Sequence, residues 1–177
     1  MHKRGYSNTS VRDIALAAGV PIGSFTNHFK SKEAFGLEVL NLYYSSNREL
    51  FLDTLRNDDK PPLKRLREWI DVTDATLNQA DAWNGCLLGN FGIEAGDETI
   101  TIQKRAGEIF REVEGHIEYC LKAAVKTGEL PAKTDCAEMA SFVLGSLQGA
   151  LLLGKAERSS APMKRFKHVL FTSLMHK

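Results

Sequence analysis

Hydrophobic residues recur every three or four positions along almost the whole chain, which is the spacing of one face of an α-helix. Polar stretches and short runs rich in glycine or proline separate these periodic segments. No alternating strand pattern or internal repeat competes with this interpretation. The pattern predicts an all-α protein with helices over residues 10–18, 21–29, 31–56, 63–81, 102–124, 135–157 and 163–174.

The first two predicted helices form a helix-turn-helix. Ser10 and Asp13 make the S-x-x-D signal of a helix start, and Gly19 ends that helix. Pro21 suits the first turn of the next helix because its missing N–H would be unpaired there in any case. The second helix of such a motif enters the major groove of DNA, so double-stranded DNA is the predicted partner.

The side chains of the second helix divide into two groups. Phe25 and Phe29 lie one helical turn apart and should face the core. Ser24 and Thr26 can bond phosphate, and Asn27 can pair with adenine through two hydrogen bonds. Gly23 lets the backbone approach DNA closely, whereas His28 suits a packing or solvated role as well as a DNA contact.

Positive charge is concentrated at the start of the chain. Residues 1–32 carry a net charge of +4, and the remainder carries −3. Neutralising phosphates releases counterions and adds affinity for DNA of any sequence, so this asymmetry favours a local nucleic-acid contact. The five basic residues concerned are Lys3, Arg4, Arg12, Lys30 and Lys32.

The rest of the chain predicts a helical body. Residues 83–96 contain repeated glycines among apolar residues, which predicts one short, irregular helix with bends. Residues 135–157 have two apolar faces, and small residues on the second suit a subunit interface in a homodimer. We expect a DNA-binding domain over residues 1–45 and an effector and dimerisation domain over 46–177. The predicted dimer interface comprises Phe142, Gly145, Gly149, Leu152, Phe166 and Leu170.

Composition narrows the possible classes. Cys86, Cys120 and Cys136 are far apart and odd in number, which favours reduced thiols in a cytoplasmic protein. The most apolar run, residues 145–154, is about half a membrane span, so no membrane partner is expected. The sequence contains no G-x-S-x-G, H-E-x-x-H or paired E-x-x-H motif. We therefore expect no enzymatic activity, cofactor or metal site.

Residues 9–34 read TSVRDIALAAGVPIGSFTNHFKSKEA. This run resembles the DNA-binding signature of the TetR-family transcriptional repressors. The resemblance implies a one-component repressor that binds a palindromic operator as a dimer and is released by a small-molecule effector. It also implies that Lys32 holds a phosphate. The resulting DNA-binding set is Ser10, Arg12, Gly23, Ser24, Thr26, Asn27, His28 and Lys32.

The same resemblance bears on residues 1–6, which correspond to the tail of a first helix that covers the other two in the family. That helix is largely missing from this sequence, so we expect a longer natural chain. A head made of two helices would leave Ile14, Phe25 and Phe29 poorly covered.

One thiol could serve as a sensor. Cys86 is predicted at a helix start, where backbone N–H groups and the helix dipole stabilise a thiolate, and Lys155 is the candidate neighbouring cation. A Gly-Cys-Leu here, followed by Glu94, resembles the NemR-like branch of the family, whose repressors sense electrophiles by cysteine modification. A buried structural role for Cys86 is the alternative. The expected effector pocket comprises Trp69, Trp83, Cys86, Phe91, Phe110 and Tyr119, although aromatics at helical spacing also suit a plain core.

Two other functions stay open from the sequence. An architectural DNA-binding protein would have the same head and a solid core without an effector. An α-helical enzyme or carrier could retain a helix-turn-helix as a packing unit. Neither accounts for the clustered charge and the glycine-broken segment together as well as a repressor does.

Overall fold

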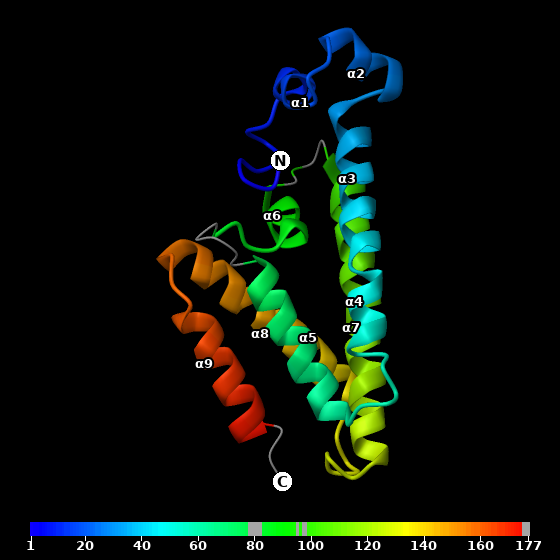
Figure 1. Ribbon diagram of the computed structural model, residues 1–177, viewed down its shortest axis with the longest axis vertical. Coiled ribbons are helices and arrows are strands. Elements are labelled where there is room, and N and C mark those ends of the chain that lie inside the picture. The colour runs from blue at the N-terminus through cyan, green and yellow to red at the C-terminus, as the bar shows by residue number, and fades with distance from the viewer. Residues whose placement is uncertain (78–82, 95, 97–98, 175–177) are drawn as a thin grey trace. The chain divides into compact units, whose positions relative to one another are not determined.

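The computed structural model describes residues 1–77, 83–94, 96 and 99–174, and all regular structure in these residues is helical (Figure 1). The chain divides into two compact units, and each unit draws on two stretches of sequence. Unit 1 comprises Met1–Ser46 and Leu87–Ile109, and unit 2 comprises Asn47–Cys86 and Phe110–Lys177. The predicted all-α class is confirmed.

Unit 1 contains the helix-turn-helix. Helix α1 spans Val11–Ala17, α2 spans Ile22–His28 and α3 spans Lys32–Ser46; α6, Leu87–Glu94, and the first turns of α7, Ile100–Lys126, complete the unit. The predicted start of α1 is confirmed as a capping box, because Ser10 and Asp13 each accept a hydrogen bond from the other's backbone N–H. Gly19 takes the left-handed conformation that ends α1, with φ +68°.

An aromatic cluster holds α2 against α3. The Phe25 ring lies 5.3 Å from Phe29 and 5.7 Å from Phe35 between centroids, and only 6% of Phe25 is exposed. The expectation that Phe25 would be poorly covered is therefore wrong, because Phe35 of α3 supplies the missing cover. Ile14 and Phe29 are half-buried, and Ile14 borders a groove of about 840 Å³ between α1, α3 and the first residues of the chain.

The predicted helix over residues 31–56 is wrong in one respect, because it is two helices. Helix α3 ends at Ser46 and α4 spans Arg48–Asp53, with Asn47 between them at φ −90° and ψ 0°. The hydroxyls of Ser45 and Ser46 donate to the carbonyls of Leu42 and Tyr43. Such bonds to the preceding turn compete with the helical ladder, and hydrophobic periodicity carries no signal of them.

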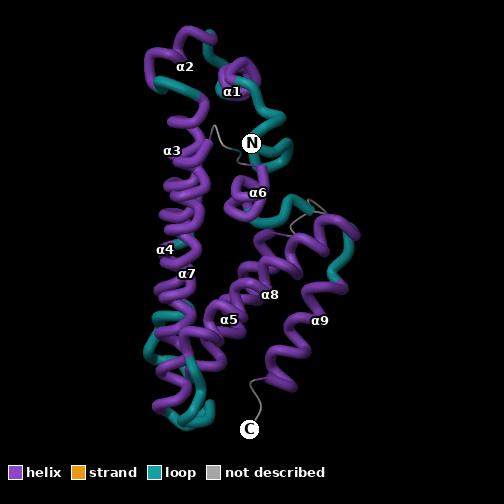
Figure 2. The backbone as a smooth tube through the Cα atoms, turned by 180° about the vertical axis from the view of Figure 1, so that it is seen from behind, coloured by secondary structure: helices purple, strands orange, loops and turns teal. Residues whose placement is uncertain are grey.

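Unit 2 consists of α4, α5 (Pro62–Leu77), the remainder of α7, α8 (Cys136–Glu157), α9 (Ala161–Val169) and a π-helical turn, Leu170–Leu174 (Figure 2). Asp135 caps α8, since its carboxylate accepts from the N–H groups of Ala137 and Glu138. The last helix was predicted to begin at residue 163, but α9 begins at Ala161, and Pro162 lies inside its first turn, where proline is tolerated. The core of the unit includes Leu66, Ile70, Ile117, Leu121, Val143, Leu147 and Met163.

The glycine-rich segment differs from its prediction. Residues 83–86 are not helical, and α6 then runs as one helix of eight residues over Leu87–Glu94. The predicted fading of the preceding helix near Asp81 falls outside the part of the chain that the structure describes.

Helix α8 has the two apolar faces that the sequence predicts. Ala140, Val143 and Leu147 are buried, whereas Phe142 and Leu152 are each 51% exposed. Among the described residues, α8 is also long and apolar enough to cross a membrane, with a mean hydropathy of 1.5 over its most apolar eighteen residues. The same values suit a core helix of a soluble protein, and 39% of that window is buried inside the structure.

Candidate nucleic-acid interface and regulatory residues

Helix α2 presents a polar face. Thr26, Asn27 and His28 are exposed, while Phe25 on the opposite side is buried in the aromatic cluster. Gly23 is exposed, with open space where a side chain would be, and Ser24 is half-buried. The Thr26 hydroxyl donates to the Gly23 carbonyl at 2.9 Å, which fixes its rotamer. This face can approach base edges without displacing any core residue.

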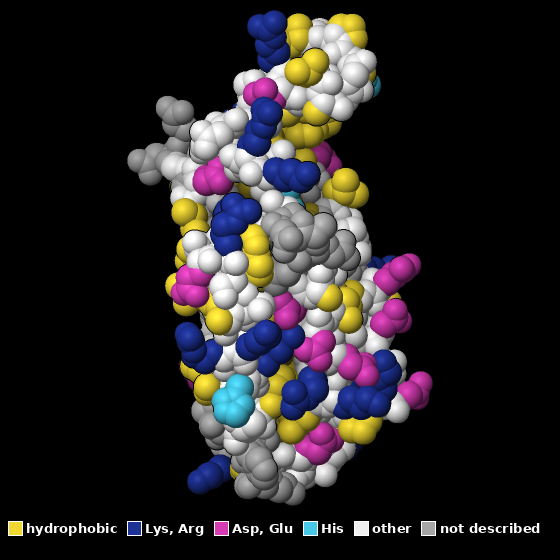
Figure 3. Space-filling view, turned by 60° about the vertical axis from the view of Figure 1, so that its left-hand side comes forward, with side chains coloured by type: hydrophobic (Ala, Val, Ile, Leu, Met, Phe, Trp, Pro, Cys, Tyr) yellow, Lys and Arg dark blue, Asp and Glu magenta, His cyan; other side chains and the backbone are white. Residues whose placement is uncertain are grey.

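Basic residues accompany this face within unit 1. Lys3, Arg12 and Lys30 are exposed, and basic and hydrophobic side chains are both visible at the upper end of Figure 3. Arg4 instead forms an ion pair with Asp13, in which Nη1 lies 3.2 Å from Oδ1. The capping hydrogen bonds from Ser10, followed by Arg4, lower the pKa of Asp13. Ser10 therefore caps α1, and this role does not depend on a contact with DNA.

Lys32 begins α3 and is held from two sides. Its Nζ donates to the Ser7 carbonyl at 3.4 Å and lies 4.4 Å from the centre of the Tyr6 ring. Tyr6 is 6% exposed, and Lys32 is half-buried. Burial and the Glu33 carboxylate raise the pKa of the Tyr6 phenol, so it stays neutral near pH 7. The structure thus gives Lys32 a defined position beside the helix-turn-helix.

The residues expected in an effector pocket fall into both compact units. Phe91 belongs to unit 1 and is 1% exposed, with its ring 5.4 Å from Tyr6. Trp69, Trp83, Cys86, Phe110 and Tyr119 belong to unit 2, where Trp69 is 4% exposed. The pocket stays a prediction. The groove between α1 and α3 is lined by other residues, and so is a groove between α8 and α9.

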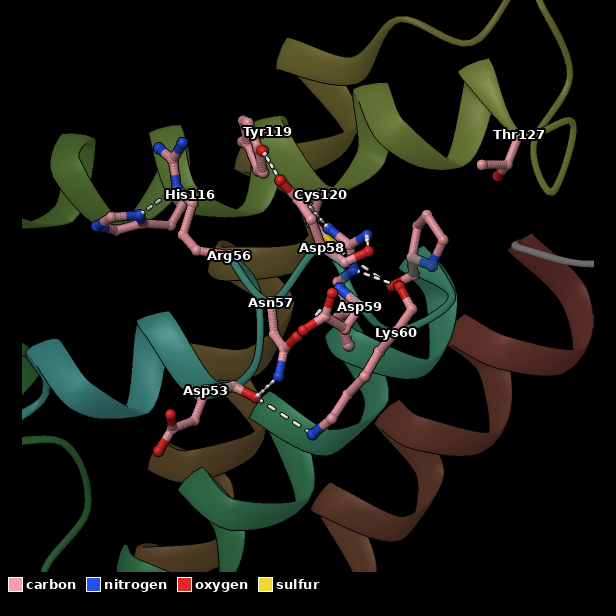
Figure 4. Close-up of polar contacts among 12 residues, drawn as sticks. Asp53, Arg56, Asn57, Asp58, Asp59, Lys60, His116, Tyr119, Cys120 and Thr127 are labelled. Atoms are coloured by element: carbon pink, nitrogen blue, oxygen red, sulfur yellow. Dashed lines mark hydrogen bonds and ion pairs between the residues drawn. The ribbon is translucent and has the colours of Figure 1, made fainter.

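Tyr119 takes part in a polar network that the sequence did not reveal (Figure 4). Its hydroxyl donates to Asp58 at 2.7 Å, and Asp58 accepts from the buried Arg65 at 2.5 Å. The Arg56 guanidinium lies 4.1 Å from the centre of the Tyr119 ring and donates from Nε to Nδ1 of His116 at 2.9 Å. The network joins α7 to α5 and to the segment that precedes α5.

Two effects lower the pKa of His116. Burial is the larger, and the positive charge of Arg56 adds to it, while Glu112 acts in the opposite sense. The imidazole also stacks on Phe51, with centroids 4.5 Å apart. The hydrogen-bond donor to this imidazole, Arg56, lies 60 positions earlier in the sequence.

The predicted dimer surface is a mixture of exposed and buried residues. Gly145 is exposed like Phe142 and Leu152, whereas Gly149 and Phe166 are half-buried. Leu170 is 1% exposed and packs within the chain itself. A groove of about 300 Å³ runs between α8 and α9, and its walls include Phe142, Gly149, Phe166 and Leu170.

Comparison with known proteins identifies the family. The profile described as "Tetracyclin repressor-like, C-terminal domain" matches residues 62–170, and that of "Bacterial regulatory proteins, tetR family" matches residues 1–39. The chain belongs to the TetR family of transcriptional regulators. The resemblance seen in residues 9–34 is thereby confirmed, and so is the expectation that the protein is not an enzyme, because this family is not enzymatic.

Several relatives of this TetR-family chain are named repressors or regulators. The HTH-type transcriptional repressor DhaR of Mycobacterium sp. strain GP1 is 35% identical, over 98% of this chain and 85% of DhaR. The transcriptional regulator AcuR of Cereibacter sphaeroides is 30% identical, over 93% and 75% of the two chains. The crystal structure of a regulatory protein TetR from Rhodobacter sphaeroides superposes with a TM-score of 0.88 at 27% identity, covering 95% and 89%.

NemR of Escherichia coli K12 is a more distant relative, at 24% identity over 92% of this chain and 81% of NemR. Its reduced form has the same fold, with a TM-score of 0.82. In this TetR-family chain, Cys86 directly precedes α6 and is 9% exposed, and Lys155 lies exposed in α8. The sensor role of Cys86 and Lys155 stays a prediction.

The other two thiols, Cys120 and Cys136, are buried. Cys120 is 1% exposed, donates to the Pro62 carbonyl at 3.1 Å, and has a pKa raised to about 12, mainly by burial. Cys136 lies at the start of α8, and burial likewise raises its pKa. Neither environment favours a thiolate.

Proposed function

We propose that this TetR-family regulator is a one-component repressor whose dimer binds a palindromic operator. Residues 1–45 would bind DNA, and residues 46–177 would bind the effector and the second protomer. The two α2 helices would enter successive major grooves, about 34 Å apart along the duplex. A small-molecule or electrophile effector would favour a state in which the two heads no longer match this spacing.

The observation that carries this proposal is the division of α2 into a buried aromatic side and an exposed polar side. Asn27 can make a bidentate pair with adenine, which is worth about 1–3 kcal/mol of discrimination against the wrong base. Thr26 and Ser24 are suited to phosphate, and so is Arg12 on the exposed surface of α1. The exposed apolar residues of α8 support the dimer, since a partner helix would cover them.

The operator can be found by selecting bound fragments from a random DNA pool with the full chain. The selected sites should share two inverted half-sites, because a two-fold dimer reads the same sequence on each strand. Sites with one half only, or without a common sequence, would contradict the proposed mode of binding. A library of small molecules is then tested for release of the selected DNA, measured by fluorescence anisotropy.

Two substitutions separate base reading from phosphate binding. Asn27→Ala should relax the base preference at one position of each half-site. Arg12→Ala should weaken binding to all sequences about equally and flatten the salt dependence. Lys104→Ala is the matched control, because Lys104 is an exposed lysine of α7 in unit 1 with no proposed DNA contact. If Asn27→Ala leaves the selected sequence unchanged, α2 does not read it through this residue.

A further inference from the structure

We propose that Glu94, at the end of α6, is a positioning residue for Lys32. This inference rests on the proposed function, in which Lys32 binds a phosphate of the operator. Glu94 acts on Lys32 indirectly, through Ser7. It acts on the segment around Ser7, which in turn holds the lysine ammonium.

The first step concerns the lysine. A lysine side chain is long and loses considerable rotamer entropy when it is fixed, so an unsupported lysine pays that cost on binding DNA. Here the Ser7 carbonyl accepts a hydrogen bond from Nζ of Lys32, and the same ammonium makes a cation–π contact with the Tyr6 ring. An ammonium has three donors, so these two contacts still leave one for a phosphate oxygen. The lysine is therefore preorganised for its proposed ligand.

The second step concerns the support of Ser7 itself. Residues 5–9 contain no helix, so regular hydrogen bonding does not fix them. The Glu94 carboxylate accepts from the Ser7 N–H at 2.8 Å, and the Ser7 hydroxyl donates to the Glu94 carbonyl at 3.5 Å. Ser7 thus lies between a carboxylate on its N–H and an ammonium on its carbonyl, and charge strengthens both hydrogen bonds.

The third step concerns how closely Glu94 packs against this segment. A Cβ on Gly5 would overlap the carboxylate oxygens of Glu94, far inside van der Waals contact. Gly5 has φ +83°, and its carbonyl accepts from the buried Thr9 hydroxyl at 2.6 Å. The carboxylate therefore occupies space that only glycine leaves free, and a displacement of Glu94 moves the segment that carries Ser7.

The salt dependence of operator affinity tests this proposal. Each lost phosphate contact flattens the slope of log K against log salt by about 0.9, so Lys32→Ala in both protomers should flatten it by about 1.8. Over a fourfold rise in salt, that change corresponds to roughly tenfold less loss of affinity than the unmodified protein shows. Glu94→Ala should flatten the slope in the same direction, and the double variant should add little to Lys32→Ala.

Matched variants separate positioning from charge and folding. Glu38→Ala removes one exposed carboxylate from the same unit and should keep the original slope. Glu94→Gln should keep the slope of the unmodified protein, because the amide oxygen of glutamine can still accept a hydrogen bond from the Ser7 N–H. Glu94→Asp keeps the charge but is one methylene shorter, so it should flatten the slope even if Glu94→Ala does not fold.

Failure of the inference and failure of the proposed function give different results. If Lys32→Ala leaves the slope unchanged, Lys32 binds no phosphate and the function proposed for it is wrong. If Lys32→Ala flattens the slope while Glu94→Ala and Glu94→Asp keep the slope of Glu38→Ala, Glu94 does not position Lys32. A drop in melting temperature without a change in slope also overturns the inference, since a merely structural residue would behave in that way.

Discussion

Two glycines of unit 1 offer a paired test of the packing between Glu94 and the segment before α1. Gly5 and Gly19 both have left-handed backbones, with φ +83° and +68°. A Cβ on Gly19 would meet nothing within 4 Å, whereas a Cβ on Gly5 would overlap the Glu94 carboxylate. Replacing each by alanine therefore adds the same backbone strain to both sites and a steric overlap to only one.

The expected costs follow from these environments. A residue with a Cβ in the left-handed region costs about 1–2 kcal/mol, so Gly19→Ala should destabilise the protein by about 1 kcal/mol. Gly5→Ala should carry this cost and also displace Glu94 from the Ser7 N–H. A hydrogen bond to a charged group is worth about 1.5–3 kcal/mol, and partial exposure reduces that contribution to about 1 kcal/mol here. Gly5→Ala should therefore cost about 2–3 kcal/mol in total.

Thermal unfolding followed by circular dichroism measures the difference. A chain of this length loses about 2–4 °C for each kcal/mol, so Gly5→Ala should melt several degrees below Gly19→Ala at equal protein concentration. In a Glu94→Ala background the overlap is gone, and the additional cost of Gly5→Ala should fall to that of Gly19→Ala. Equal melting temperatures for the two single variants would refute the reasoning, and so would a Gly5→Ala cost that Glu94→Ala does not change.

Three further predictions concern unit 2. Because the folded state lowers the pKa of His116 below 6.5, its neutral form stabilises the fold above that pH, and this contribution is lost as the pH falls from about 7 to 5. Urea unfolding should show a weaker loss over this range for His116→Gln, and an unchanged pH profile would contradict the assignment. Thiol alkylation near pH 7, followed by mass spectrometry, should modify Cys86 well before Cys120, whose pKa is about 12; equal rates would remove Cys86 as a sensor. Phe142→Glu should shift the protein from dimer to monomer in analytical ultracentrifugation while its circular dichroism stays helical, and an unchanged mass would place the interface elsewhere.

Local signals were sufficient for much of the fold. The Ser10 and Asp13 pair, the glycine at position 19 and the Asp135 cap each act within a few residues, so their structural effect is visible in the sequence. The same holds for the polar side of α2, because Phe25 marks its buried side. The break at Asn47 was missed because hydrophobic periodicity continued across it.

Contacts between distant residues could not be predicted in this way. Glu94 and Ser7 are 87 positions apart, and Arg56 and His116 are 60 apart, so no periodicity or spacing relates them. Each pair meets because the core brings separate helices together, and packing then decides which polar groups share a hydrogen bond. Helix positions and their apolar faces are properties of neighbouring residues, whereas the support of Lys32 and the lowered pKa of His116 exist only once the chain has folded.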